Sequence, residues 1–536
     1  MKKTSENTGT FFNRLRSSKI TWVVLLGAFL RLFYIGNIPG NTALYVDEMF
    51  SGYGAWSILN YGYEISGYHL PMYLTSWGSG MSALQAYIQI PFIAVFGLTG
   101  FALRLPAAIL GCITLYAFYY ICRSIKNEDF AVFAAFILAV IPWHIIMSRW
   151  ALDCNYFVGF ITITIALMIK ASKDNRFLPL AFFFIGITLY AYALTWTVMP
   201  LFVLLAVIYL FRSGAIRFDR HFLISVVVLG LTALPALLFM AVNLGMMPEI
   251  KTPFFSVPKL MIFRSNELSL SPRAMLSHIY AAFKMFVEQD DGTVTGSTPT
   301  FGIYYKISGI FILIGLAECL VSFFGGQKRR GNEVYFLILF FCSLIIAATT
   351  DLYFYRINMI QIPMTYFLAN GLWFLTDLLQ KRSKEIVILA YGILCFFFFT
   401  YYITDYDDTI ATRFADGSKD ALAYVDSLKE NGEIPQGSTI NVFSGISYVT
   451  VLYYEKYPTD AYVSEVVYDP DTFASHRALA QSFGDYYFYY DELPEEAPKS
   501  GDVFMCSHDD EPAMGYLEAN NMNIRYFSNI AVGVAP

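Results

Sequence analysis

Two adjacent carboxylates, Asp47 and Glu48, follow a hydrophobic segment closely and lie in the aromatic stretch "ALYVDEMFSGYGAW". No Lys or Arg occurs between Asn37 and Leu103, so the surrounding loop offers no cation to partner them. Such surroundings shift the pKa of a carboxyl group toward values useful for proton transfer. The alternative is structural, with the pair solvated and capping a short interfacial helix.

Two further polar patches occur later in the chain. "MSRWALDCN" contains Arg149 and Asp153, which would form an ion pair worth a few tenths of a kcal/mol if both lay on one exposed helix. "DLYFYRINMIQIP" contains Arg356, at the start of an apolar run. Its side chain either extends to the membrane surface or binds a partner. The functional interpretation is a phosphate clamp, because a guanidinium matches a phosphate through two parallel hydrogen bonds.

Three weaker candidates complete the set. Glu64 and His69, in "YEISGYHLP", are candidates for lining the same site as the carboxylate pair, although a single histidine more often has a structural role. Arg264, in the long segment 243–300, is a candidate for contact with a lipid headgroup or phosphate. Arg31 and Glu318 lie inside apolar runs, where burial beside a partner accounts for them.

Composition places these residues in a membrane protein. Of the 536 residues, 56% are hydrophobic and only 15% are charged, and the mean hydropathy is +0.50. Residues 1–402 carry 29 basic and 19 acidic residues (+10), whereas residues 403–536 carry 7 basic and 23 acidic residues (−16). We expect an α-helical polytopic membrane domain over 1–402 and an acidic extracytoplasmic domain over 403–536. Nothing in the charge pattern indicates a nucleic-acid partner. The cysteines show no disulfide framework or zinc spacing.

The positions of basic residues predict the orientation of the spans. An apolar run from Ile20 to about Ile35 follows the basic N-terminus without a cleavage site, so it is an uncleaved first span. If the N-terminus is inside, residues 37–103 lie outside, and only one of the runs 80–97 and 102–122 crosses. The second leads directly into Arg123 and is the span, whereas the first is an interfacial helix.

This pattern predicts 11 spans with the N-terminus inside and the C-terminus outside. They cover residues 20–35, 102–122, 130–147, 155–170, 177–194, 196–211, 221–242, 301–324, 333–349, 357–378 and 385–402. The tail mixes a helical stretch, "SKDALAYVDSLKENG", with β-type runs, "STINVF", "DYYFYY", "GDVFMC" and "NIRYF", which indicates a small α/β domain.

The order of these motifs resembles that of the GT-C glycosyltransferases of family 39. These include protein O-mannosyltransferases and the bacterial transferase that attaches aminoarabinose to lipid A. The resemblance is carried by "VDE", "FGLTGFALRLPAAILG", "MSRWALD" and "YRINMIQIP" in that order, and it covers residues 20–240 and, more loosely, 350–380. Segment 243–300 is too short for the β-trefoil domain of the eukaryotic mannosyltransferases, which favours a bacterial enzyme.

The resemblance implies an inverting transfer from a polyprenyl-phosphate sugar at the outer face of the plasma membrane. The acceptor would be a protein, a glycolipid or a cell-wall polymer, with membrane lipid around the enzyme. Asp47 would be the general base, Glu48 would orient it, Asp153 would be the acid of the second outer loop beside Arg149, and Arg356 would bind the donor phosphate. The second loop lacks an Asp-x-Asp pair, so no bound metal is implied, and a Mg²⁺ or Mn²⁺ cofactor stays open.

The family's Lys/His-Pro-Pro stretch is replaced here by "SWGSGMSAL", so a ligand for metal or substrate contributed there is missing. Two alternative functions remain, a transporter and a non-catalytic membrane assembly subunit. The polar candidates concentrate at the outer surface rather than at the membrane midplane, which disfavours a transporter. The family's catalytic Asp position, occupied here by Asp47, argues against an inert subunit.

Overall fold

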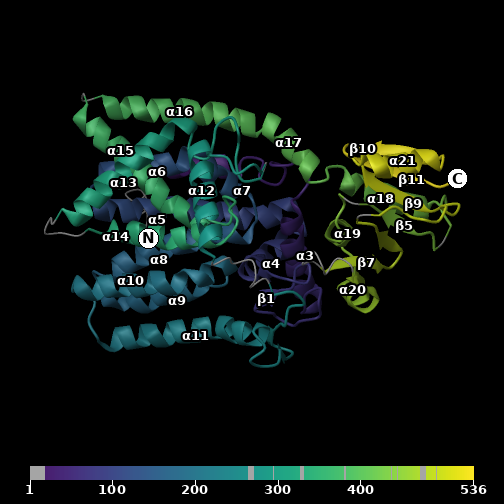
Figure 1. Ribbon diagram of the computed structural model, residues 1–536, viewed down its shortest axis with the longest axis horizontal. Helices are drawn as coiled ribbons and strands as arrows, with labels where there is room; N and C mark the ends of the chain where they lie inside the picture. Colours follow the sequence, from purple (N-terminus) through teal and green to yellow (C-terminus); the bar gives the residue numbers. More distant parts are fainter. Residues whose placement is uncertain are drawn as a thin grey trace, which may run out of the picture. The chain divides into compact units, whose positions relative to one another are not determined.

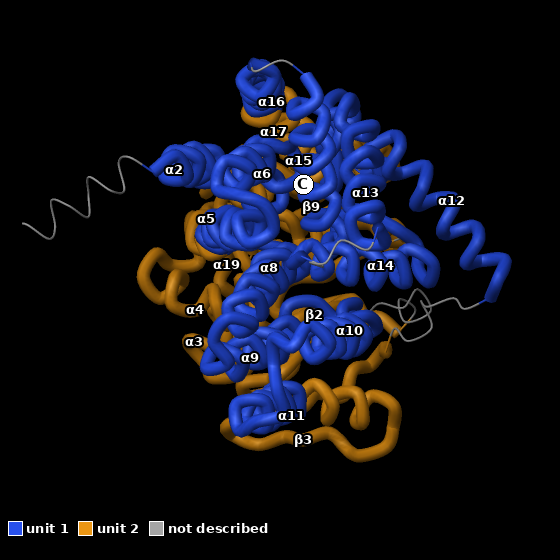
Figure 2. The backbone as a smooth tube through the Cα atoms, turned by 90° about the vertical axis from the view of Figure 1, so that its left-hand side faces the viewer, with its two compact units in different colours: residues 1–33, 107–234, 267–401 blue, residues 34–106, 235–266, 402–536 orange. Residues whose placement is uncertain are grey.

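The computed structural model of the chain describes residues 18–263, 271–293, 295–325, 331–379, 382–435, 437–443, 445–470, 478–490 and 492–536. The chain is mostly helical (Figure 1) and divides into two compact units, each built from three separate stretches (Figure 2). Unit 1 comprises residues 1–33, 107–234 and 267–401, and unit 2 comprises residues 34–106, 235–266 and 402–536. The division of the chain into domains at residue 403 stays a prediction.

Every predicted span contains a helix. The helices are α2 (Lys19–Leu32), α5 (Gly100–Ile125), α6 (Glu128–Val140), α7 (Pro142–Arg149), α8 (Asp153–Ala171), α9 (Leu178–Thr188), α10 (Met199–Arg212), α11 (Arg220–Asn243), α13 (Gly309–Phe324), α14 (Val334–Thr349), α15 (Gln361–Leu378) and α16 (Ser383–Tyr402). Within the described ranges, five helices are long and apolar enough to cross a membrane. Helices α6 and α7, bent by 61° at their junction, make a sixth if they form one span. The 11-span topology stays a prediction.

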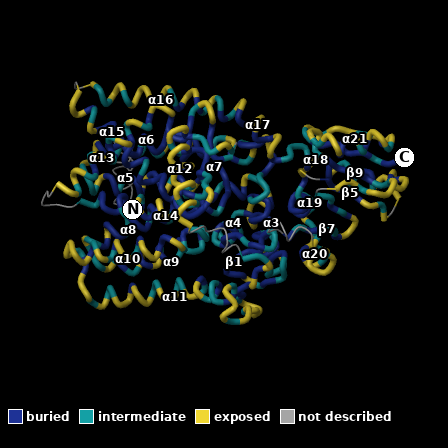
Figure 3. Tube along the Cα trace, in the orientation of Figure 1, coloured by how far each residue is buried: buried dark blue, intermediate teal, exposed yellow. Residues whose placement is uncertain are grey.

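The surface of unit 1 fits a lipid environment. Helix α16 exposes large apolar side chains, such as Leu389 at 64% and Phe396 at 69%, and α11 exposes Leu231 at 66%. Figure 3 shows both helices largely exposed along their length, whereas α6 and α8 lie in the interior. Apolar surface on this scale is stable against hydrocarbon and is unfavourable in water.

Two buried arginines donate hydrogen bonds to carbonyl oxygens at the ends of helices in unit 1. Arg31, on α2, donates a hydrogen bond to the carbonyl oxygen of Ala139 near the end of α6, at 3.2 Å. Arg149, the last residue of α7, donates to the carbonyl oxygens of Leu30 (3.0 Å) and Phe33 (2.7 Å) at the end of α2. These carbonyl groups have no partner within their own helix, and a cation suits the negative end of a helix. Arg31 is therefore buried beside partners, as expected.

Glu318 has partners as well, as expected, although it is only half-buried. Its carboxylate accepts a hydrogen bond from Asn370 on α15 and lies 3.7 Å from the ammonium group of Lys126. Helices α13 and α15 also pack closely at two glycines, since a Cβ atom on Gly315 or Gly371 would overlap the backbone of the other helix. Close backbone approach of this kind is typical of helix contacts in membranes.

Unit 2 begins with the predicted outer loop. It contains α3 (Val46–Tyr61), the short hairpin of β1 (Tyr73–Leu74) and β2 (Met81–Ser82), and α4 (Leu84–Phe96). Helix α4 confirms that residues 80–97 contain a helix, and its interfacial location stays a prediction. The stretch 235–266 adds β3 (Ile250–Lys251) and β4 (Ser256–Val257), which form a second short hairpin.

The tail forms an α/β fold around one seven-stranded sheet. The strand order is β10-β11-β9-β5-β8-β7-β6, and β5 runs parallel to both of its neighbours while the other pairs are antiparallel. The strands are β5 (Ile440–Val442), β6 (Val467–Asp469), β7 (Leu479–Phe483), β8 (Tyr486–Phe488), β9 (Val503–Ser507), β10 (Asn523–Phe527) and β11 (Ile530–Val534). The helices are α17 (Asp405–Arg413), α18 (Ser418–Glu430), α19 (Tyr448–Glu455), α20 (Thr459–Glu465) and α21 (Glu511–Ala519). Each helical or β-type stretch that the sequence predicted in the tail is present.

Helix α3 packs against α4 and against α19 of the tail. The hydroxyl group of Tyr53 donates to the carbonyl oxygen of Tyr457 at 2.5 Å. The carboxylate of Asp407 accepts the N–H of Gly40 at 2.5 Å. The tail therefore holds the first outer loop at both ends of the segment that carries the carboxylate pair.

Candidate active site

Asp47 and Glu48 occupy the first turn of α3. A carboxylate is stabilised there by the unpaired N–H groups at a helix start. Glu48 caps the helix directly, since its Oε2 accepts the N–H of Tyr45 at 3.2 Å. Asp47 is half-buried, whereas Glu48 is fully buried.

Glu48 forms a bidentate ion pair with Arg104, near the start of α5. The Nε atom donates to Oε1 at 2.8 Å and Nη2 donates to Oε2 at 2.7 Å. Both side chains have no exposed surface. A buried pair of this kind offsets the cost of desolvating two charges through its geometry and added hydrogen bonds. It fixes the first turn of α3, and with it the backbone of Asp47.

The sequence-based expectation that the carboxylate pair has no cation to partner it is therefore wrong for Glu48. The cation comes from Arg104, one residue beyond the stretch without basic residues. Sequence reasoning missed Arg104 as a functional residue. The sequence did contain a signal for Arg104. An arginine in an apolar run needs an acidic partner, and Glu48 was an acidic residue to which no basic partner had been assigned.

The second patch differs from the predicted i, i+4 pair. Helix α7 ends at Arg149, α8 begins at Asp153, and residues 150–152 between them are not helical. The two residues therefore do not share an exposed helix, and Arg149 is fully buried at the end of α2. Asp153 is half-buried, and its Oδ1 accepts the N–H of Cys154 at 2.7 Å.

Arg356 lies in the loop between α14 and α15 and is half-exposed. Its Nη1 donates to Thr350 Oγ1 at 3.4 Å and to the carbonyl oxygen of Asp351 at 3.3 Å. Its guanidinium carbon lies 5.6 Å from the centre of the Tyr353 ring. Burial raises the pKa of the Tyr355 phenol, and the positive charge of Arg356 beside it opposes that shift. Arg356 thus lies in an aromatic loop and is only partly buried.

A buried polar chain joins the loops of Asp153 and Arg356. Asn358 donates to Asn155 Oδ1 at 2.8 Å and accepts the indole N–H of Trp143 at 2.8 Å. Asn155 and Asn358 each lie two residues after one of the charged residues. The charges of Asp153 and Arg356 also both act on the phenol of Tyr192. The structure therefore brings these two predicted residues together within unit 1.

The weaker candidates have local partners in unit 2. Glu64 is buried and accepts the hydroxyl group of Thr75 at 3.0 Å, and burial raises its pKa to about 7. His69 pairs with Tyr63 in a β-bridge, with the ring centres 5.3 Å apart. Arg264 lies outside the described residues. A role for Glu64 and His69 at the site of Asp47 stays a prediction.

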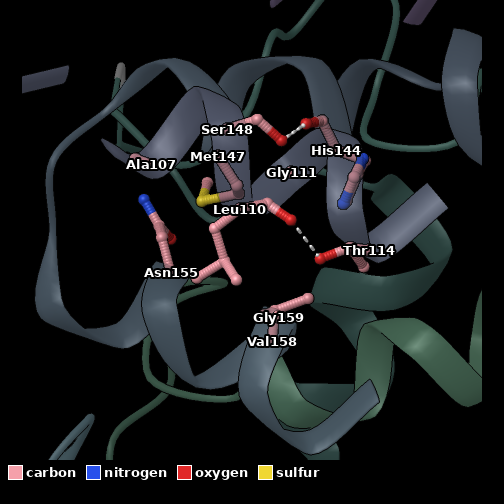
Figure 4. Close-up of a pocket in the computed structure, with 10 residues that line it drawn as sticks. All are labelled: Ala107, Leu110, Gly111, Thr114, His144, Met147, Ser148, Asn155, Val158 and Gly159. Carbon is pink, nitrogen blue, oxygen red and sulfur yellow. Dashed lines mark hydrogen bonds between the residues drawn. The ribbon is translucent and has the colours of Figure 1, made fainter. Parts of the chain in front are cut away.

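A small cavity lies among α5, α7 and α8 of unit 1 (Figure 4). The hydroxyl groups of Thr114 and Ser148 in its wall donate to carbonyl groups of their own helices. Most of the remaining wall is apolar, so the cavity offers little that would bind a charged group. It is lined by Ala107, Leu110, Gly111, Thr114, His144, Met147, Ser148, Asn155, Val158 and Gly159.

Carboxylates, histidines and cysteines do not gather into a metal site in the part of the chain that the structure describes. No group of three such side chains there is close enough to hold a metal ion.

Residues 82–244 match the family of dolichyl-phosphate-mannose-protein mannosyltransferases. The matched stretch includes Arg104, Arg149 and Asp153 but not Asp47 or Arg356. The sequence matches none of the curated proteins with which it was compared.

The structure is similar to that of ArnT from Cupriavidus metallidurans bound to undecaprenyl phosphate. The two chains are 12% identical, the match covers 96% of this chain and 97% of ArnT, and the TM-score is 0.53. The chain has a GT-C fold of the mannosyltransferase and ArnT type. This GT-C fold is also similar to that of the Archaeoglobus fulgidus oligosaccharyltransferase, crystallised with Zn and sulfate. That match has 15% identity and a TM-score of 0.51, covers 82% of this chain, and spans 61% of the archaeal protein.

Proposed function

We propose that this protein is a membrane glycosyltransferase that moves a sugar from a polyprenyl-phosphate carrier to an acceptor hydroxyl group. The observation that carries the proposal is the scaffold around Asp47. A fully buried, bidentate Glu48–Arg104 pair fixes the helix turn that presents a half-buried carboxylate. A scaffold of this kind is the support that a catalytic group needs to keep its geometry.

The chemistry requires one base and one cation. An acceptor hydroxyl group has a very high pKa, so a carboxylate must take its proton as attack proceeds, and Asp47 is the proposed base. The departing lipid phosphate needs its charge stabilised more than it needs a proton. Arg356 is the proposed phosphate ligand, with Asp153 beside its loop. A single displacement at the anomeric carbon inverts the configuration.

The carrier is proposed by analogy with the similar structures. ArnT is described with undecaprenyl phosphate, and the archaeal oligosaccharyltransferase with a tethered acceptor peptide. For this chain we propose a polyprenyl-phosphate donor and an acceptor hydroxyl group on a protein, glycolipid or cell-wall polymer.

We also propose that the site and the tail face the outside of the plasma membrane. Residues 34–106 and 402–536 belong to one compact unit, which supports placing them on the same side of the membrane. The predicted topology, with the N-terminus inside and the tail outside, also puts residues 37–103 and the tail on one side. The compact unit is an independent argument, because the prediction used only the distribution of Lys and Arg.

A single-turnover assay tests the proposed base. Asp47→Asn keeps the size and hydrogen-bonding capacity of the side chain and removes its basicity. General-base assistance contributes about 10²–10⁴ in rate, so transfer from a defined undecaprenyl-phosphate sugar should slow at least about a hundredfold. Asp129→Asn is the matched control, because Asp129 is also a first-turn carboxylate but lies in a predicted inner loop. Transfer by Asp47→Asn at the wild-type rate would show that Asp47 is structural.

Donor binding tests Arg356 separately. Arg356→Lys keeps the charge but loses the bidentate geometry, so undecaprenyl phosphate should bind more weakly while the protein stays folded. Arg217→Lys, at an exposed site in a predicted inner loop, should leave binding unchanged. If Arg356→Ala also binds undecaprenyl phosphate with wild-type affinity, Arg356 only extends its side chain to the membrane surface.

A further inference from the structure

The loop that carries Arg356 is held from one side by α12 (Pro272–Glu288) and the turn that follows it. Helix α12 packs against α14, and its His278 places Nε2 3.4 Å from a carboxylate oxygen of Asp351. The ring of Phe286 meets the ring of Phe354 edge-on, with the centres 5.8 Å apart. Both contacts lie within unit 1 and involve residues shortly before Arg356 in the sequence.

The strongest contact comes from Asp291, in the turn after α12. Its Oδ2 accepts the backbone N–H of Phe354 at 2.9 Å. Its Oδ1 accepts the N–H and the hydroxyl group of Thr293, at 3.0 and 2.8 Å, and the hydroxyl group of Ser297 at 3.3 Å. The two carboxylate oxygens therefore bind different segments. Oδ1 accepts hydrogen bonds within the turn, and Oδ2 accepts one from the loop that carries Arg356.

The loop is fixed on its other side by Asn358, through Asn155 and Trp143. The two anchor points, Phe354 and Asn358, lie two residues before and two residues after Arg356. The hydrogen bonds from Arg356 to Thr350 and Asp351 are 3.4 and 3.3 Å long, at or beyond the weak end of the usual range. The two anchors hold the backbone on both sides of Arg356 and so help to set where its side chain starts.

We propose that Asp291 is a positioning residue for the lipid-phosphate site, acting through the backbone of Phe354 on Arg356. The inference rests on the proposed role of Arg356 and adds the residue that sets its location. Asp291 itself carries a negative charge, so direct contact with a phosphate would be repulsive. Its contribution to binding must come through the loop.

The test measures binding of undecaprenyl phosphate to the full-length protein in lipid nanodiscs. Asp291→Ala should weaken binding about tenfold, the worth of one charge-assisted hydrogen bond. Asp290→Ala is the matched control, because Asp290 accepts the N–H of Gly292 and the hydroxyl group of Ser297 within the same turn. This control removes the same charge from the same turn and should keep nearly wild-type affinity. Asp291→Asn retains one carbonyl oxygen and should restore part of the lost affinity.

A double-mutant cycle separates action through Arg356 from general damage. The double variant Asp291→Ala/Arg356→Ala should bind no more weakly than Arg356→Ala alone. Hydrogen exchange of the amides in 350–357 should accelerate in Asp291→Ala and not in Asp290→Ala. Additive losses in the cycle, equal losses in the two aspartate variants, or tighter binding by Asp291→Ala would each overturn the inference. If the Arg356→Ala variant bound with wild-type affinity, the proposed role of Arg356 as phosphate ligand would be overturned as well. This result distinguishes failure of the role of Arg356 from failure of the role of Asp291 alone.

Discussion

Removing one partner of the Glu48–Arg104 pair should destabilise the first turn of α3 severely. The two side chains have no exposed surface, and two hydrogen bonds of 2.7 and 2.8 Å join them. Glu48→Gln leaves the guanidinium of Arg104 charged and uncompensated in the interior. Breaking a buried pair in this way costs about 3–5 kcal/mol. The double variant Glu48→Met/Arg104→Met removes both charges and should recover most of that loss, because an apolar pair of similar volume is often neutral.

The chain offers a matched control at almost the same distance. Lys19 and Asp129 form an ion pair of 2.9 Å, but their side chains are 74% and 70% exposed. Solvent screens such a pair, so Asp129→Asn should have a far smaller effect than Glu48→Gln. The comparison tests burial rather than bond length as the cause of the large effect.

Hydrogen exchange of the α3 amides is the suitable assay, because it reports local opening without requiring two-state unfolding of the whole chain. A loss of about 3–5 kcal/mol corresponds to opening that is roughly two to three and a half orders of magnitude more frequent. Exchange of the first turn in Glu48→Gln within tenfold of wild type would refute the reasoning. So would a double variant as destabilised as the sum of its single variants. The assay also separates positioning from catalysis, since Asp47→Asn should leave exchange unchanged while transfer slows at least about a hundredfold.

Two further predictions concern acidity and topology. Burial raises the pKa of Glu64 from the ordinary 4.5 to about 7 in the folded state, so the stabilisation from its protonated form is complete below about pH 4.5 and is lost as the pH rises through about 7. Unfolding experiments should show a loss of up to about 3 kcal/mol over this window, and Glu64→Gln should flatten the profile; an unchanged profile would contradict the raised pKa. Single cysteines at exposed positions Asn41 and Asp509 should react with an impermeant reagent from outside, and cysteines at Lys173 and Arg217 only from inside; labelling of Asn41→Cys and Lys173→Cys from one side would refute the topology.

Hydropathy predicted the helices well, because apolar runs flanked by charged loops are local features of a sequence. It could not predict where the helices break. Pro142 begins α7 directly after α6 and bends the pair by 61°. Helix α12 was not predicted, because it does not lie in an apolar run. It lies in a loop segment where apolar residues recur with helical spacing among polar ones.

The candidate site was predictable as a list of residues and not as a set of contacts. The pairing of Glu48 with Arg104 spans 56 positions, and that of Asn155 with Asn358 spans 203. Such pairings follow from the packing of helices, which no short motif encodes. Arg149 shows the converse error, because a spacing of four to Asp153 suggested a local pair where the structure turns the arginine toward α2. Asp291 carried no sequence signal beyond its place in an acidic turn.

The reciprocal arginine contacts of α2 have a consequence for how the chain is made. Arg31 donates to a carbonyl group near the end of α6. The carbonyl groups at the end of α2 accept hydrogen bonds from Arg149, which is synthesised 119 residues after Leu30. At a synthesis rate of about 5–20 residues per second, that interval lasts roughly 6–24 s. If α2 is the predicted first span, it enters the bilayer during this time with a polar side chain and a polar end that their final partners do not yet cover. Its insertion would then be completed only when α7 emerges from the ribosome, and the translocon or bound lipid would have to cover Arg31 until then.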